Sequence, residues 1–533
     1  MTPHFFSTKP TEELIEDGVK AEYLNDDALS RALDCIADYG VTKFYATLAL
    51  DIGIEHNLIG KTARLDSTTF VFHGDYEGDT IEIKENINIE NSVEIQNNLD
   101  KKSESIKIKQ EEMIAEEKLE VIELNYGYSK DHRPDLKQAT FSIATTGVGS
   151  YPFWCEPQNG NSSDKSAFQE SIKKYHELKK QMKAAPDFTW VADSALYNGK
   201  KLLGKNAGQF KWITRVPESI KEAKNLVKTK NSELNLIDIG NGYSLHSCLS
   251  NYGDIEQRWL LIFSEQAAYR EIKTLERKIE KAMKAHHKAI LSLNKKKFES
   301  EKEAIDAAGK LIKKLFYFTG TYEIEIVEKN EKKGRPLQNA AKIISFYKIL
   351  VKIEKNEIKI NEEKLTKGRF ILATNQMNEE ELTNIQIFEE YKSLQNTERG
   401  FRFFKDPWFL AKQFFLKTPS RIAALMSIMS LSLLVYTAAE IKIRAALKEE
   451  KETIPDQNKR PIQRPTLRFI FQLFSSVTKI TIKSKNEVVG LKKDCSELKT
   501  NPPNYIFIKL TDVQRKIIRL FGGEIEKIYF SDG

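Results

Sequence analysis

Cysteine is scarce in this sequence, and the cysteines that occur are far apart. Cys35, Cys155, Cys248 and Cys495 form no Cys-x-x-Cys pair. This spacing excludes a disulfide-stapled scaffold and a structural zinc site, and it predicts a reducing, cytoplasmic location. The first residues, MTPHFFSTKPTEEL, also lack the apolar stretch of a signal peptide.

A strong excess of one charge is absent too. Lys and Arg total 83 and Asp and Glu total 76, which gives a formal net charge of +7. Such a mild balance permits a polyanionic partner without requiring one. Hydrophobic residues make up 40% of the 533 residues, so a sizeable core is expected and wholesale disorder is excluded.

Only one long apolar run is present. Residues 422–439, IAALMSIMSLSLLVYTAA, carry no charge and are flanked by Arg421 and Glu440. A membrane-spanning helix needs about 20 apolar residues, so this run is at the lower limit of length. It also contains several Ser and Thr residues. We therefore predict a buried core helix and no membrane contact, with a membrane helix as the alternative.

The predicted elements alternate between helices and strands, which indicates a mixed α/β sheet. Asn25, Asp26 and Asp27 are the predicted capping residues of a helix that stops at Gly40. KTARLDSTTFVFHG predicts a strand, ATFSIATTGVGSYPFWCEP a hairpin, and FTWVAD and QFKWITRVP two further strands. Between the hairpin and FTWVAD, a helix is predicted with Phe168, Ile172 and Tyr175 on one face.

Changes in composition divide the chain into predicted segments. The stretch 77–120 is rich in Ile, Glu, Asn and Lys and has no aromatic residue, which is typical of a low-complexity surface excursion. The stretch 266–315 is Lys-rich and predicted to be helical. The segments are a helical N-terminal segment (1–59), the first part of a sheet-based core (60–216), an insertion domain (217–385), helices that complete the core (386–450) and a C-terminal region (451–533).

Two acidic residues occupy predicted strand positions. Asp66 lies inside RLDSTTFVF, and Asp193 closes FTWVAD. For either acid alone, a cap or a solvated strand end is the simpler interpretation. Adjacent strands lie about 4.8 Å apart, so two acids on neighbouring strands can share one pair of divalent ions. Such a pair supports in-line attack on a phosphodiester.

A third acid, Glu398, belongs to a spaced signature. Its members follow one another with two, three and six residues between them: Tyr391, Leu394, Glu398 and Lys405. On a single helix they would share one face with Arg402. Together with GYSKDHRPDLKQ, ITRVP, TERGFRFFKDPWFLAK and RPTLRFIFQ, this string resembles the Tyr-Arg-Glu-Lys signature of DDE-type bacterial transposases. The similarity is to the insertion-sequence-four superfamily, in its branch with long insertions, and it covers most of residues 20–530.

The resemblance implies an α/β fold with a ribonuclease-H-like mixed-sheet catalytic core, interrupted by a large α+β insertion domain and preceded by the helical N-terminal segment. It implies that Asp66, Asp193 and Glu398 are catalytic and bind two Mg2+ ions, which Mn2+ can replace. It also implies a homodimer on DNA in the bacterial cytoplasm, associated with the nucleoid, where element terminal inverted repeats and target DNA are the partners. The expected DNA-contacting residues are Tyr391, Lys405, Arg402, Arg399, Lys130, His132, Arg133 and Arg215.

Two features depart from the family pattern. Leu394 stands where the signature has Arg, so Arg399 or Arg402 is expected to make that phosphate contact. The first acid is already at residue 66, which predicts a shortened N-terminal DNA-binding region. Two alternatives to a transposase follow. One is an inactive shortened copy that binds DNA or regulates, and the other is a ribonuclease-H-like nuclease without strand transfer.

Overall fold

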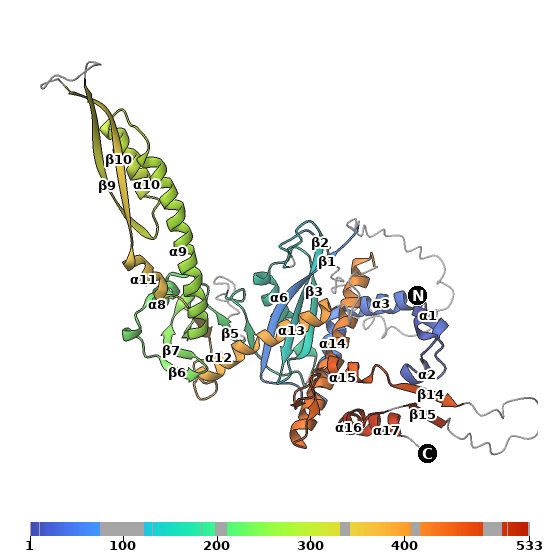
Figure 1. Ribbon diagram of the computed structural model, residues 1–533. Coiled ribbons are helices and arrows are strands. Elements are labelled where there is room, and N and C mark those ends of the chain that lie inside the picture. Colours follow the sequence, from blue (N-terminus) through green and yellow to red (C-terminus); the bar gives the residue numbers. More distant parts are fainter. Residues whose placement is uncertain are drawn as a thin grey trace, which may run out of the picture. The chain divides into compact units, whose positions relative to one another are not determined.

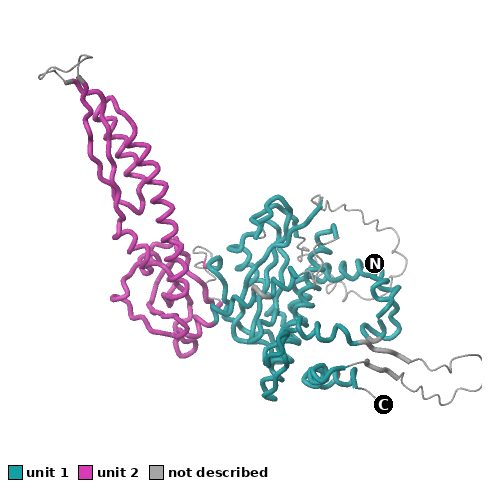
Figure 2. The backbone as a smooth tube through the Cα atoms, in the orientation of Figure 1, with its two compact units in different colours: residues 1–196, 390–533 teal, residues 197–389 magenta. Residues whose placement is uncertain are grey.

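The computed structural model is of the mixed α/β class (Figure 1). Its chain forms two compact units: Met1–Leu196 with Glu390–Gly533 is unit 1, and Tyr197–Glu389 is unit 2 (Figure 2). The predicted insertion 217–385 falls inside unit 2, whereas the predicted excursion 77–120 lies outside the described residues. The structure describes residues 2–9, 11–74, 122–130, 132–182, 184–197, 210–330, 342–406, 416–482, 504–508 and 510–530.

Short helices form the start of unit 1, as predicted. The Asn25 side chain accepts a hydrogen bond from the Ala28 amide and caps helix α3, which ends before Gly40 at a φ of 96°. That backbone angle favours glycine, so the residue separates two helices that would otherwise be continuous. The elements are α1 (Thr2–Phe6), α2 (Thr11–Leu14), η1 (Ala21–Tyr23), α3 (Asp26–Tyr39) and α4 (Val41–Glu55).

The sheet of unit 1 is mixed, with strand order β3-β2-β1-β4. Strand β1 pairs antiparallel with β2 and parallel with β4, and β2 forms the predicted hairpin with β3. Nearly every residue of β1 is buried, because both faces of this strand are covered. The strands are β1 (Thr62–Phe72), β2 (Lys137–Thr146), β3 (Tyr151–Gln158) and β4 (Thr189–Ala192).

Helix α6 (Asp164–Gln181) uses the predicted apolar face. Phe168, Ile172 and Tyr175 are buried, and the Tyr175 ring lies 5.3 Å from that of Trp190 and 5.8 Å from that of Phe153. These ring contacts join the helix to β4 and β3 through edge-on aromatic packing.

The apolar run forms helix α14 (Pro419–Glu449), which packs on β3, α3 and α4. Among the described residues it is the helix long and apolar enough to cross a membrane by length and composition, but half of its apolar window is buried within the protein. Ile422, Ala424 and Met426 are almost fully buried, whereas Val435 is exposed. The burial agrees with the predicted core helix.

The remaining elements of unit 1 lie in its C-terminal part. Helix α13 (Gln395–Lys405) lies on β1 and β2. Helices α14, α15 and α16 share an apolar cluster that includes Ile443, Leu467 and Ile517. The other elements are β12 (Ile454–Pro455), β13 (Pro461–Ile462), α15 (Leu467–Phe474), β14 (Thr478–Ile482), β15 (Asn504–Ile508), α16 (Asp512–Phe521) and α17 (Gly523–Phe530).

Unit 2 contains an antiparallel array of strands in the order β5-β11-β8-β7-β6 and a two-stranded ribbon, β9 with β10. The Lys-rich stretch 266–315 is two helices instead of one, because α9 ends at Asn294 and Ser300 caps α10. The elements are β5 (Lys211–Arg215), α8 (Lys221–Lys228), η2 (Asn231–Glu233), β6 (Ile237–Gly240), β7 (Tyr243–Ser250), η3 (Tyr252–Asp254), β8 (Gln257–Ser264), α9 (Glu265–Asn294), α10 (Glu301–Ile312), β9 (Phe318–Asn330), β10 (Lys342–Lys355), α11 (Glu357–Leu365) and β11 (Arg369–Thr374), and α12 (Asn384–Ser393) crosses from unit 2 into unit 1.

Candidate active site

Asp66 lies in the middle of β1, opposite Ile143 of β2. Its side chain is partly buried in a strand whose neighbours are almost all fully buried. One carboxylate oxygen, Oδ1, accepts a hydrogen bond of 2.7 Å from the amide of Ser67. The strand therefore holds a carboxylate at a position where polar groups need a partner.

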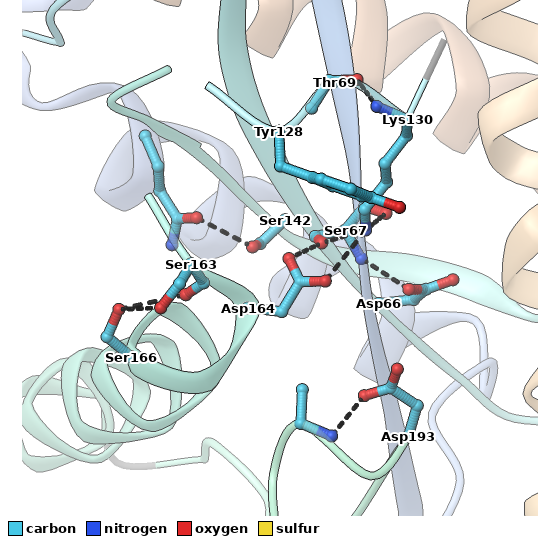
Figure 3. A network of polar contacts seen from close by, with 12 residues as sticks. Asp66, Ser67, Thr69, Tyr128, Lys130, Ser142, Ser163, Asp164, Ser166 and Asp193 are labelled. Carbon is cyan, nitrogen blue, oxygen red and sulfur yellow. Dashed lines mark hydrogen bonds and ion pairs between the residues drawn. The ribbon is translucent and has the colours of Figure 1, made fainter. Parts of the chain in front are cut away.

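Asp193 directly follows β4, the parallel neighbour of β1. In the register of the two strands Arg64 lies beside Val191. Asp66 and Asp193 each follow two residues later, so the two acids are at matching positions of the parallel pair. The Asp193 carboxylate is exposed and accepts a hydrogen bond of 2.8 Å from the Ala195 amide. Figure 3 draws both carboxylates. The structure therefore brings the two predicted strand acids together.

The electrostatics of Asp66 reflect this placement. The pKa of its carboxyl is raised from the ordinary value of 3.8 to about 6, mainly by burial and in smaller measure by the negative charges of Asp193 and Asp164. The positive charge of Lys130 and the hydrogen bond from the Ser67 amide lower this pKa in part. A desolvated carboxylate with negatively charged neighbours is stabilised by a nearby positive charge, here that of Lys130.

Lys130 is held next to this pair by protein oxygens. Its ammonium donates hydrogen bonds of 2.7 Å to both the carbonyl and the hydroxyl oxygen of Ser67, and it forms an ion pair of 3.1 Å with Asp164 (Figure 3). The Ser67 hydroxyl in turn donates to Asp164, the first residue of α6. Lys130 was expected to contact DNA phosphate; that contact stays a prediction, and the structure gives its ammonium three protein partners.

Glu398 lies on α13, which packs against β1 and β2; the placement of its side chain, like that of Arg399, is outside the described part of the structure. The helix is fixed close to Glu398, because the buried hydroxyl of Thr397 lies 2.9 Å from that of Thr145 on β2. Further along, the Phe404 ring contacts those of Phe70 and Phe141 at 6.1 and 5.8 Å. The segment that carries the third acid therefore lies on the strand that carries the first.

The signature residues lie on two helices that one residue separates. Helix α12 ends at Ser393 and α13 begins at Gln395, and the backbone of Leu394 between them keeps helical angles (φ −54°, ψ −32°). At the junction the Leu394 amide bonds the Tyr391 carbonyl and the Thr397 amide bonds the Leu394 carbonyl, which are three-residue steps of a tighter turn. Tyr391 therefore belongs to α12, and Glu398, Arg402 and Lys405 belong to α13.

The predicted DNA-contacting residues are distributed over different surroundings. Arg402 and Lys405 are exposed on α13, Tyr391 is partly buried on α12, and His132 is exposed in its loop with a φ of 58°. Two others have carboxylate partners: Arg133 pairs with Asp135 at 2.7 Å, and Arg215 of β5 pairs with Glu218 at 2.6 Å.

Sequence reasoning missed the groups that surround the acids. Arg64, Ser67, Asp164 and Glu390 belonged to no motif in the sequence. Within the described side chains no group of three His, Cys, Asp or Glu residues is arranged to hold a metal ion. Asp66 and Asp193 supply two ligands of the predicted set, and Glu398, the third, is not among those side chains.

A family model matches the N-terminal helices. Residues 1–50, from α1 into α4, match a domain of unknown function (DUF4277) that is found in transposase-like proteins. No curated protein matches the chain. The matched helices α3 and α4 pack on α14 of the same unit, so the domain is joined to the unit that holds Asp66 and Asp193.

Proposed function

We propose that this protein is a DDE-type DNA transposase of the insertion-sequence-four superfamily. The observation that carries the proposal is the placement of Asp66 on β1 beside Asp193 at the end of parallel strand β4, with the Glu398 helix packed on β1 and β2. The match of residues 1–50 to a domain found in transposase-like proteins supports it independently.

The arrangement of strands supports a ribonuclease-H-like core. The family resemblance implies one acid on the first strand, one on the fourth and a Glu on a helix after an insertion. Here the acids fall on β1 and at the end of β4, in a mixed sheet of order β3-β2-β1-β4. Glu398 follows unit 2 in the chain.

The carboxylates fit the divalent ions that the family uses. Asp66 and Asp193, with Glu398, would hold Mg2+ or Mn2+, because hard cations prefer carboxylate oxygens and because the raised pKa of Asp66 marks a desolvated anionic position. A pair of such ions stabilises charge on the attacking and departing oxygens of a phosphodiester displacement. Lys130, held by Ser67 and Asp164, fixes the start of the polar loop beside the acids.

The proposed reaction has two transfers at phosphorus. Water forms a new P–O bond at an element end while the P–O3′ bond breaks, which leaves a 3′-hydroxyl. That hydroxyl then forms a P–O bond with target DNA while a target 3′-hydroxyl departs. Arg402 and Lys405, exposed on α13, would contact backbone phosphates near Glu398. One transposition event processes two DNA ends, which favours a homodimer as the active form.

The test uses purified full-length protein, donor DNA carrying this coding sequence with its flanking chromosomal DNA, and a supercoiled plasmid as target. We expect Mg2+-dependent 3′-hydroxyl ends at the element boundaries and joined products in the plasmid. Asp193→Asn removes both products but keeps DNA binding, whereas Asp51→Asn, at an exposed position of α4, leaves both unchanged.

Each alternative predicts a different product pattern in this assay. Cleaved ends without joined products identify a nuclease. DNA binding without cleavage in Mg2+ or Mn2+ identifies an inactive, regulatory copy. Cleavage that survives Asp193→Asn contradicts the assigned site.

A further inference from the structure

A buried ion pair joins β1 to the segment that returns from unit 2. The Arg64 guanidinium donates a hydrogen bond of 2.7 Å to Oε2 of Glu390, and the Thr62 hydroxyl donates to the same oxygen at 2.7 Å. The Arg64 side chain is 8% exposed and also bonds the Gly147 carbonyl at 3.0 Å. We name these interactions the Glu390 contact. Nη1 and Nη2 of Arg64 and the Thr62 hydroxyl each have a defined acceptor, so the geometry of Glu390 is set by β1 and the β2–β3 turn.

Glu390 is the point at which the chain re-enters unit 1, since unit 2 ends at Glu389. The next residues complete α12 and lead through the tight turn at Leu394 into α13. The Ser393 hydroxyl bonds the Glu390 carbonyl at 2.6 Å, which joins the Glu390 contact to that turn. The first residue of the returning segment is therefore already bonded to the catalytic strand.

The strand side of the contact shares a face with Asp66. Side chains two residues apart in a strand point to the same side, so Arg64, Asp66 and Phe70 all face the returning segment. Arg64 bonds Glu390 and Phe70 contacts Phe404. Asp66 therefore lies between two fixed points on the strand, just as Glu398 lies between two fixed points on the returning segment.

The two spacings are matched. A helical rise of about 1.5 Å per residue takes residues 390–404 over about 21 Å. A strand rise of about 3.3 Å per residue takes residues 64–70 over about 20 Å. The contacts at the two ends are therefore separated by similar lengths on both segments, and together they limit how far α13 can slide along β1.

We propose that Glu390, through Arg64 and Thr62, is a positioning residue that sets the register of α13 on β1 and so brings Glu398 to Asp66. The inference rests on the proposed function, because the role of Glu398 comes from it. Glu390 touches no reacting atom; it acts through the helix. An insertion as large as unit 2 separates Asp193 from Glu398 in the chain, and the Glu390 contact restores a defined position directly after it.

The test compares Glu390→Gln with Glu389→Gln, the same substitution at the neighbouring exposed position. Amide hydrogen exchange of the full-length protein is followed by mass spectrometry. We expect exchange in 391–405 to become about tenfold faster in Glu390→Gln, as for a locally weakened segment, with the rest of unit 1 unchanged. Exchange in Glu389→Gln stays at the wild-type rate.

A second readout is the Mg2+ dependence of DNA cleavage. Residues that orient metal ligands change metal affinity by about tenfold or more when replaced, so Glu390→Gln raises the half-saturating Mg2+ concentration by that factor while DNA affinity is retained. Glu390→Asp, which keeps the charge on a shorter side chain, restores part of the loss.

In the exchange measurement, two results overturn the inference: unchanged exchange in 391–405, or exchange that accelerates equally throughout unit 1, which identifies a general stabilising pair. The exchange measurement needs no activity. If the wild-type protein cleaves no DNA, the proposed function fails, while the exchange measurement still tests whether Glu390 positions α13. If the wild type cleaves DNA and Glu390→Gln has the wild-type Mg2+ dependence, the inference alone fails.

Discussion

Replacing Asp66 by Asn should make the metal-free protein more stable at neutral pH. Its carboxyl has a pKa raised by burial from 3.8 to about 6, so the folded state disfavours the ionised form that the unfolded chain accepts freely. Asn is nearly isosteric, carries no charge, and its amide oxygen can still accept the hydrogen bond of the Ser67 amide. The substitution therefore removes the unfavourable charge and little else.

The size and sign of the effect follow from the two pKa values. A shift from 3.8 to about 6 corresponds to about 3 kcal/mol of stability lost on full ionisation. Solvent that reaches the partly buried carboxyl reduces this figure to about 1–3 kcal/mol. Because the folded pKa is the higher one, stability is present below pH 3.8 and is lost as pH rises through 6. The advantage of Asp66→Asn is therefore largest near pH 8 and falls to about 0.5 kcal/mol at pH 4.

Urea unfolding of the wild type and Asp66→Asn at pH 4, 5, 6 and 8 measures this dependence in buffer with EDTA. The same series is repeated with 10 mM Mg2+, since an ion bound at Asp66 and Asp193 would remove the cost of ionising the buried Asp66 carboxyl in the wild type. We expect Mg2+ to stabilise the wild type at pH 8 and to have a much smaller effect on Asp66→Asn. Asp51→Asn, exposed on α4, controls for the loss of one surface charge.

Two outcomes refute the reasoning. If Asp66→Asn is less stable than the wild type at pH 8 without metal, the carboxylate is not strained by burial. If Mg2+ stabilises both proteins equally, the ion binds elsewhere and Asp66 is not its ligand.

Two further predictions concern α13. Phe404→Ala should lower the free energy of unfolding by about 3–5 kcal/mol, because its buried ring packs against those of Phe70 and Phe141. Urea unfolding measures this loss, with Arg402→Ala as the exposed control on the same helix. A loss below about 1 kcal/mol contradicts the packing. Lys405→Ala should weaken DNA binding and lower the slope of log affinity against log salt by about one unit; fluorescence anisotropy across a salt series checks this, and an unchanged slope excludes a phosphate contact.

Local patterns predicted much of the secondary structure because they depend on neighbouring residues alone. Asn25 caps α3 as its side chain and position indicate, and Phe168, Ile172 and Tyr175 form the buried face of α6 as helical spacing requires. The tighter turn at Leu394 between α12 and α13 had no signal in the sequence. The hydrogen bond between the hydroxyls of Thr397 and Thr145 had none either, because its two residues are far apart in the chain.

Some residues of the candidate site could be found from the sequence, and others only from the structure. Apolar, β-branched runs identified Asp66 and Asp193, because an acidic residue within or at the end of such a run stands out in the sequence alone. The Lys130–Asp164 ion pair and the Glu390 contact were invisible, because their partners are far apart in the chain and each residue type is common on surfaces. Burial makes a partner necessary for a charged side chain, and only the folded chain shows which charges are buried.

The sequence alone therefore determined the elements, the strand acids and the family resemblance, since these follow from residue type and spacing. Tertiary structure decided which strands are neighbours, and through them that Asp66 lies beside Asp193 and that α13 lies on β1 and β2. The physical reason is that strand pairing and burial are long-range: the pKa of Asp66 depends on desolvation and on charges contributed by β4, α6 and the loop of Lys130, which only the folded chain brings together.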